Sequence, residues 1–416
     1  MQRSPIVYFL FFISGITALI YEIVWTRMLT LVFGHTVFSV SVVLAAFMAG
    51  LGLGSYLFGY AVDRLPETQG SSAGGKAALL IYGWVEILIF ASGALLSFLF
   101  ANFSGIYASL HSVIPESIAL QNLIRMVFAF ALMLIPTTLM GATLPIISKY
   151  CITDDSRIGT QVSLLYALNT LGGALGCLMT GFFLMGTFGI LQTVLLAAGA
   201  NLLIGIGALS IYLETVPGAD WKFHLPPLRA PHIDWSREQK FWMGISFICG
   251  FTALAYEVLW TRLLVFSTAS TIYSFSMMLT VFLLGIFLGS LLLIPLAARI
   301  HNIRTALLIL QVGTGLYVIG SIYGLESILS APWNGYNLSQ PLSVFLRYFK
   351  DSAGLMLIPT VFLGMCFPLL VKMISGKHQN IGKATGQIYS ANTLGAILGS
   401  LCAGFLFLPN LGSQVS

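Results

Sequence analysis

Three glutamates lie inside long apolar stretches of this sequence: Glu22, Glu86 and Glu257. An ionisable side chain in such a stretch is costly unless it faces a partner or a water-filled cavity, so it marks a candidate functional site. Glu22 and Glu257 occupy the same place in a duplicated segment, GITALIYEIVWTR at 15–27 and GFTALAYEVLWTR at 250–262. We therefore expect these two carboxylates to face each other across a pseudo-symmetry axis.

Aromatic residues surround both repeated glutamates. Tyr21 and Trp25 flank the first, and Tyr256 and Trp260 flank the second. Aromatic faces attract organic cations, and carboxylates attract their ammonium groups. The combination predicts a site for a basic, elongated amine.

A structural interpretation of the same glutamates depends on Arg27 and Arg262. A five-residue step turns a helix by about 140°, so neither arginine shares a face with the glutamate of its own segment. Pairing across the repeats, Glu22 with Arg262 and Glu257 with Arg27, would form a gate. Substrate or proton binding and a structural ion pair both remain open at this point.

Other polar residues in apolar stretches add to the candidate site. Glu86 has Thr314 at the aligned position of the second half, and such asymmetry is typical of a proton or specificity site. Asn169 and Asn392 recur in YALNTLGGALG and YSANTLGAILG. Membrane-buried asparagine either lines a cavity or hydrogen-bonds a neighbouring helix.

The segment Gly59–Arg64 reads G-x-x-x-D-R and ends an apolar stretch. It resembles the loop signature of the major facilitator superfamily, in which the Asp and Arg help to lock one conformation. That resemblance assigns gating to Asp63 and Arg64, whereas the second half has Ala298 before Arg299. A basic helix cap with a terminating Asp is the alternative.

The elements that must position these residues are transmembrane helices. The chain is 57% hydrophobic and 8% charged, and its apolar runs are long enough to cross a bilayer. In such a membrane protein, the net charge of +5 is no sign of nucleic-acid binding. We expect no catalytic set, cofactor, metal site or disulfide, because the cysteines are scattered and no nucleotide or nucleophile motif is present. Eleven spans are predicted, near 5–33, 37–61, 77–101, 122–149, 161–186, 189–213, 240–267, 270–298, 304–329, 343–372 and 385–409.

The repeat continues beyond its first helix pair and defines the architecture. LMLIPTTLMGATLPIISK at 132–149 matches LMLIPTVFLGMCFPLLVK at 355–372, and prolines interrupt both of these helices. Most Lys and Arg residues fall on one side when the N-terminus is cytoplasmic. We predict an all-α polytopic, major-facilitator-like bundle of two parallel repeats: a six-helix lobe at 1–213, a cytoplasmic linker at 214–239 and a five-helix lobe at 240–416. Gly412 aligns with Gly189, so a twelfth helix is expected to be missing. Either the natural protein ends with eleven spans, or this chain is a fragment whose continuation returns to the cytoplasm.

The motifs GxTALxYExxWTR, FxxGxxxGS, LIPT...G...P...K and YxxNTLG resemble the membrane portion of bacterial fused major-facilitator/spermidine-synthase-like proteins. This resemblance implies a multi-pass protein of the bacterial cytoplasmic membrane that handles polyamines. It also implies a cytoplasmic aminopropyltransferase-like domain beyond the C-terminus. We expect an alternating-access transporter of a small cationic amine. The alternatives are a membrane anchor or scaffold for such a synthase domain, or an enzyme for a lipid-embedded substrate, for which no catalytic set is seen.

Overall fold

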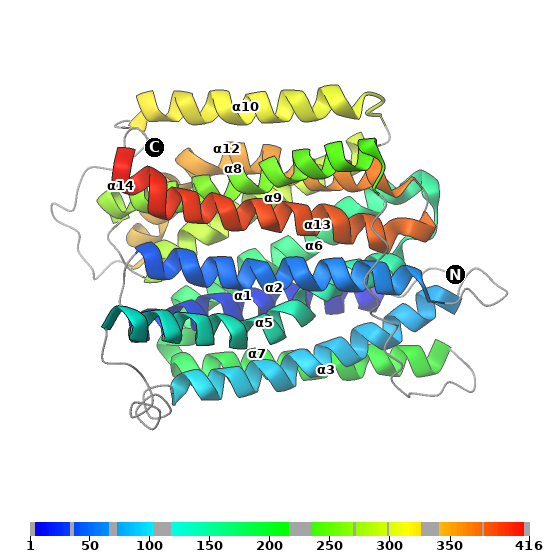
Figure 1. Cartoon of the computed structure of the whole chain (residues 1–416), viewed down its shortest axis with the longest axis horizontal. Helices are drawn as coiled ribbons and strands as arrows, with labels where there is room; N and C mark the ends of the chain where they lie inside the picture. Colours follow the sequence, from blue (N-terminus) through cyan, green and yellow to red (C-terminus); the bar gives the residue numbers. More distant parts are fainter. Residues whose placement is uncertain are drawn as a thin grey trace.

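The computed structural model describes residues 5–33, 37–65, 73–102, 118–215, 235–268, 272–297, 299–325, 341–376 and 378–411, and within these residues every regular element is helical. Figure 1 shows the long helices running side by side along one axis. Their bounds are α1 Pro5–Phe33, α2 Val37–Asp63, α3 Ala73–Ala101, α5 Ile118–Cys151, α6 Ile158–Met179, α7 Met185–Thr215, α8 Arg237–Thr268, α9 Ile272–Leu296, α10 Ile303–Tyr323, α12 Pro341–Ser375, α13 Ile381–Leu401 and α14 Leu408–Leu411.

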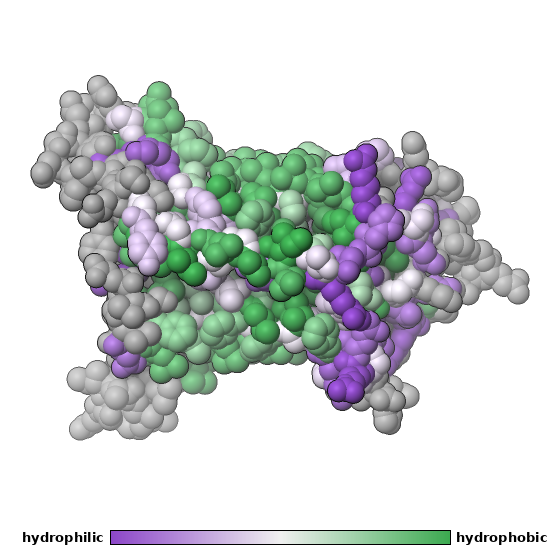
Figure 2. All heavy atoms as spheres, turned by 90° about the horizontal axis from the view of Figure 1, so that it is seen from above, coloured by the Kyte–Doolittle hydropathy of each residue, from purple (hydrophilic) through white to green (hydrophobic). Residues whose placement is uncertain are grey.

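The apolar length of these helices confirms a polytopic helical membrane protein. Ten spans in the described part of the chain are long and apolar enough to cross a bilayer. One of them, Asp155–Thr215, has 61 residues and contains two of the eleven predicted spans, which part at Gly189, where φ is +79°. Only glycine adopts such a backbone conformation readily. On the face seen in Figure 2, apolar side chains cover the middle of the molecule and polar residues gather toward one end.

Helix pairing repeats in the two halves. In the first repeat, α1 packs on α6 and α2 packs on α5; in the second, α8 packs on α13 and α9 packs on α12. The two repeats meet where α2 contacts α13 and where α6 contacts α9. In Figure 1, α3 and α7 lie at the bottom of the bundle and α10 lies at the top. The duplicated sequence thus forms two equivalent sets of helix pairs, and these sets meet at one interface between the repeats.

Glycines at repeated positions make this packing possible. A Cβ atom on Gly15 or on Gly250 would collide with the backbone carbonyl of Asn169 or of Asn392, respectively. A Cβ on Gly141 would collide with the backbone of Leu51 in the same way. Small residues let transmembrane helices approach this closely. Packing accounts for these glycines.

The prolines of α5 and α12 do not end their helices, and the bends that they allow stay a prediction. Both helices run unbroken past two prolines each, at 136 and 145 and at 359 and 368. Neighbouring helices support such positions in membranes, because they satisfy the backbone groups that proline frees.

Most of the predicted linker, residues 216–234, lies outside the described residues. The lobe boundaries and the orientation stay predictions, and the end that carries Asp63 is called the cytoplasmic end below.

Candidate functional site

A cavity of about 210 Å³ lies between the two repeats. Side chains from α1, α2, α5 and α6 line it on one side, and side chains from α8, α9, α12 and α13 line it on the other. Four of the predicted site residues face it: Glu22, Asn169, Glu257 and Asn392. Residues that are far apart in the sequence are thus brought to one central chamber.

The two repeated glutamates are the charged residues of this cavity. Glu22 on α1 is 5% exposed and Glu257 on α8 is 4% exposed. Among the described residues, neither carboxylate has a hydrogen bond within standard geometry or a cation within 4.0 Å. Both carboxyl groups line the same chamber. Two such groups in an apolar chamber call for a positive partner, because an unpaired buried charge is costly.

The predicted pairing of these glutamates with Arg27 and Arg262 is not formed. Arg27 is half-buried and makes contacts elsewhere, and Arg262 is exposed. An ion-pair gate made of these residues is therefore absent from this conformation.

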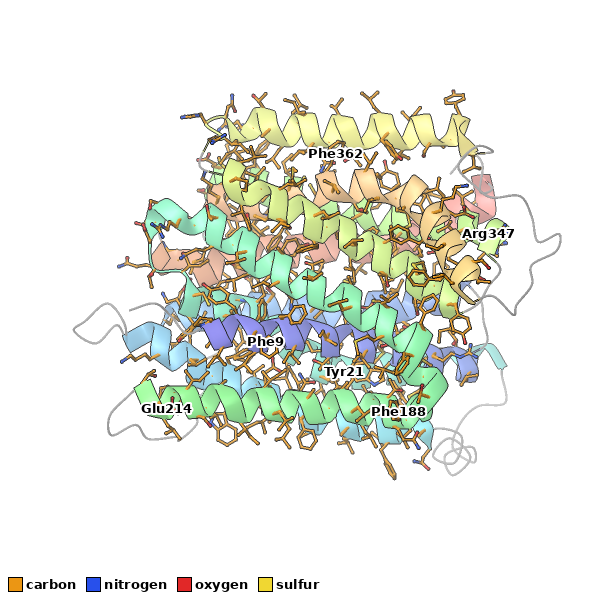
Figure 3. The ribbon with its side chains drawn as sticks, turned by 180° about the vertical axis from the view of Figure 1, so that it is seen from behind. Phe9, Tyr21, Phe188, Glu214, Arg347 and Phe362 are labelled. Atoms are coloured by element: carbon orange, nitrogen blue, oxygen red, sulfur yellow. The ribbon has the colours of Figure 1, made fainter. Side chains whose placement is uncertain are left out.

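The predicted aromatic wall lies elsewhere. Tyr21 and Trp25 pack against each other, with ring centroids 4.8 Å apart, and the Trp25 indole N–H donates to Ser97 Oγ at 2.9 Å. These rings therefore contact α3, and Figure 3 shows Tyr21 on the side of α1 away from the second repeat. Tyr256 and Trp260 stack with centroids 5.3 Å apart and do not line the cavity either.

Other aromatic residues take their place beside the glutamates. Tyr166 stacks on Phe367 with centroids 4.6 Å apart, and Phe367 meets Tyr389 edge-on at 5.9 Å. All three line the cavity. Tyr166 and Tyr389 are the first residues of the repeated YxxNTLG motif, so the signal for them was present in the sequence although the prediction passed over them.

The two asparagines both line the cavity, and one of them also bonds a neighbouring helix. Asn169 and Asn392 line the cavity, each at the helix pair of its own repeat. The Asn392 side chain also donates to the backbone carbonyl of Ser246 on α8 at 3.2 Å. Cavity lining and helix packing are therefore compatible at this position.

Glu86 does not line the cavity but lies behind its wall. Its side chain is 0% exposed. Ser14 Oγ donates to Oε1 at 2.7 Å, and Asn201 Nδ2 donates to Oε2 at 2.6 Å. Ser14 and Asn201 both line the cavity, so Glu86 is one hydrogen bond away from it. This third carboxylate belongs to the first repeat alone.

A polar cluster joins the two repeats at the cytoplasmic end. Asp63 at the end of α2 accepts from the backbone N–H groups of Gly382 at 3.3 Å and Lys383 at 2.6 Å, at the start of α13. Lys149 of α5 lies 3.2 Å from the Asp63 carboxylate and donates to the backbone carbonyl of Gln379 at 2.8 Å. An acidic side chain at a helix N-terminus is stabilised by the free N–H groups there. We call this the Asp63 latch.

Neighbouring residues extend the latch, and one predicted member lies outside it. Gln387 Nε2 donates to the Tyr60 hydroxyl at 2.6 Å, and the Lys383 ammonium lies 5.4 Å from the centre of the Tyr60 ring. Arg64 is exposed to solvent. The sequence signal for Lys149 was that lysine recurs at the same position of the internal repeat, as Lys372.

In the second repeat, no carboxylate pairs with Lys372 among the described residues. Lys372 donates to the backbone carbonyl of Ala297 at 2.7 Å, and its aliphatic chain lies against Gly159 of α6. The position equivalent to Asp63 is Ala298, which lies outside the described residues. In the described residues, the contact of α2 with α13 therefore includes an ion pair, whereas Lys372 donates to a neutral carbonyl.

Comparison with known proteins identifies the fold. No protein-family model matches the chain, and no curated protein matches its sequence. Solved structures do match it over nearly its full length. A bacterial homologue of the iron transporter ferroportin in an outward-facing state has TM-score 0.57 and 11% identity, with 98% of this chain and 93% of that chain covered.

Two further transporter structures give the same result. The human organic anion transporter MFSD10 (TETRAN) has TM-score 0.54 and 13% identity over 99% of this chain and 96% of its own. The proton:xylose symporter XylE has TM-score 0.52 and 12% identity over 97% of this chain and 88% of its own. The chain is therefore a multi-pass membrane protein with the fold of major facilitator superfamily transporters.

Proposed function

We propose that this protein is a membrane transporter that moves a small polyamine-like cation by alternating access. The observation that carries the proposal is the pair of buried carboxylates, Glu22 and Glu257, which come from equivalent positions of the two repeats and face one central cavity. Rocking one repeat against the other would then expose this fixed site to each side of the membrane in turn.

The chemistry of the cavity favours an amine cargo. Two carboxylates without a cationic partner among the described residues suit a ligand that carries two separated ammonium groups. The Tyr166 and Tyr389 rings add faces for cation–π contact. At about 210 Å³ the cavity is smaller than the roughly 300–1,000 Å³ typical of pockets for drug-sized ligands, so a slender aliphatic amine fits better than a bulky cation.

The Asp63 latch supports the alternating-access part of the proposal. It links α2 to α13, which belong to different repeats, through charge-assisted hydrogen bonds at the cytoplasmic end. Contacts of this kind hold one end closed and break when the repeats rock apart.

The resemblance to transporter–synthase fusions extends the proposal to a cytoplasmic aminopropyltransferase-like partner domain and to the bacterial cytoplasmic membrane.

Binding of spermidine to purified protein tests the cargo assignment. In the double variant Glu22→Gln/Glu257→Gln the cavity keeps its shape but loses both charges. Hydrogen bonds to charged groups contribute about 1.5–3 kcal/mol each, so we expect spermidine affinity to fall about 10- to 100-fold for each glutamate. Isothermal titration calorimetry with spermidine measures the loss, and flux into proteoliposomes measures its effect on transport.

The matched control is Glu214→Gln, which removes an exposed carboxylate at the far end of α7 (Figure 3). This variant should bind and transport spermidine as the wild type does. Equal affinity in the wild type and in a folded double variant would refute the role of the glutamates. Absence of any spermidine binding or flux in the wild type would favour the anchor function over transport.

A further inference from the structure

We propose that Glu86, which Asn201 holds in place, is a proton-binding residue that exchanges a proton with the central cavity through Ser14 and thereby links cargo movement to proton movement. The link to cargo rests on the proposed transport function. The site itself depends on the geometry of α1, α3 and α7, where three residues from distant parts of the chain meet.

The position of Glu86 combines burial with a short path to the cavity. The carboxylate is 0% exposed, and each of its oxygens accepts one hydrogen bond. Both donors line the cavity wall. A proton that enters the cavity from water therefore needs to pass only the Ser14 hydroxyl, which can accept that proton on its oxygen and release its own to the carboxylate.

The partners of Glu86 can serve either of its protonation states. The Ser14 hydroxyl can donate to a carboxylate or accept from a carboxylic acid by turning about its C–O bond. The Asn201 amide donates to the carboxylate through Nδ2, and after a rotation its Oδ1 atom can accept from the carboxylic acid. Oδ1 has no hydrogen-bond partner among the described residues. Lys or Arg at these positions would hold Glu86 in the charged form, because an adjacent positive charge favours the carboxylate. Ser and Asn leave both forms satisfied.

The second repeat shows that packing does not require an acid here. Cys249 occupies the repeat position of Ser14, and it also receives a hydrogen bond from the third helix of its repeat. That donor is Gln311 Nε2 on α10, at 3.0 Å. The position aligned with Glu86 by sequence, Thr314, instead donates to its own backbone at Leu310. A neutral amide thus makes the equivalent contact, so the carboxylate of the first repeat needs another explanation.

The surroundings of Glu86 contain few other titratable groups. Tyr82 lies one turn away on α3, Tyr21 faces it from α1, and Cys151 at the end of α5 lies close to Tyr82. Its partner from α7 is the neutral Asn201. None of the described residues forms an ion pair with Glu86. Among the described residues of this cluster Glu86 is the carboxylic acid, and a carboxylic acid is more acidic than the phenols and the thiol beside it.

Charge balance then gives the direction of coupling. Protonated Glu86 adds no charge to those of Glu22 and Glu257, whereas its carboxylate form adds a third negative charge beside them. A cationic cargo in the cavity favours the charged form of nearby carboxylates, and so it drives release of the proton from Glu86 to cavity water. Cargo and proton would therefore be exchanged for one another.

Infrared difference spectroscopy of the purified protein, taken between acidic and alkaline pH without any cargo, tests the proton site. We expect a C=O stretching band of a protonated carboxyl group that is lost in Glu86→Gln and kept in the control Glu214→Gln. Ser14→Ala keeps the carboxyl group but removes a hydrogen-bond partner, so the band should shift to higher wavenumber. This variant also covers the case in which Glu86→Gln does not fold.

A spectrum in which the band survives in Glu86→Gln, or in which Ser14→Ala leaves it unshifted, overturns the assignment. Coupling is tested by adding spermidine to weakly buffered protein with a pH-sensitive dye. The wild type should release more protons per bound spermidine than Glu86→Gln, and equal release overturns the coupling. Failure of the wild type to bind spermidine refutes the proposed function and the coupling, whereas the cargo-free spectra still decide whether Glu86 binds a proton.

Discussion

The Asp63 latch gives the sharpest prediction for a single substitution. Asp63→Asn keeps the shape of the side chain but removes its charge. The carboxylate is 10% exposed, accepts two backbone N–H groups of the α13 terminus and lies 3.2 Å from Lys149. The amide retains one acceptor oxygen, so it can keep one of these contacts, while Lys149, which is 7% exposed, loses its counter-ion.

The expected magnitude follows from these contacts. Hydrogen bonds to charged groups contribute about 1.5–3 kcal/mol, and a carboxylate at a partly buried helix terminus contributes up to about 2 kcal/mol, with overlap between the two terms. We expect the state with a closed cytoplasmic end to lose about 2–3 kcal/mol relative to the open one. Since 1.4 kcal/mol is a factor of ten, the ratio of open to closed molecules should rise about 30- to 150-fold.

Two native cysteines make this shift measurable. Cys249 and Cys366 line the cavity and are free thiols. In inside-out vesicles, a membrane-impermeant maleimide reaches them only when the cytoplasmic end opens, so the labelling rate should rise with the open population. A Cys249→Ser/Cys366→Ser background gives the labelling of the remaining cysteines.

The matched control is Asp154→Asn on the same end of the protein. Hydrogen bonds from the Ser156 side chain and backbone hold the pKa of Asp154 below its usual range, so this change also removes a full charge. Asp154 makes only local contacts with Ser156 and Arg157 in the described structure. Cavity labelling in Asp63→Asn no faster than in Asp154→Asn would refute the latch.

Three further substitutions test packing and asymmetry. Gly141→Val should destabilise the protein by about 1–3 kcal/mol, because its Cβ would enter the α2 backbone, whereas Gly315→Val meets open space; thermal unfolding in detergent compares them. Trp25→Phe loses an indole hydrogen bond worth about 1 kcal/mol, so it should lower thermal stability and leave spermidine affinity unchanged. A loss of affinity would show that Trp25 belongs to the binding site after all. Lys372→Met breaks a bond to a neutral carbonyl only, so it should raise cavity labelling less than Asp63→Asn does.

Several features of this protein could be read from its sequence because they depend on local composition or on the internal repeat. Continuous apolar runs predict spanning helices, since no other element satisfies its backbone within a single segment of membrane. The repeated glycines indicate where helices touch, and Gly15 and Gly250 do make equivalent contacts. The same repeat pointed to Glu22 and Glu257 as a pair, and both face one cavity.

What the tertiary structure decided is which face of each helix meets which neighbour. Adjacent residues on a helix point about 100° apart, so Tyr21 and Glu22 cannot share surroundings, and the rotation of α1 placed the ring against α3 and the carboxylate at the cavity. The latch joins Asp63 to Lys383, 320 residues away, and Glu86 meets Asn201, 115 residues away. In apolar helices with little amphipathic pattern, sequence periodicity carries no information on such rotations, and only the packing of all helices together determines them.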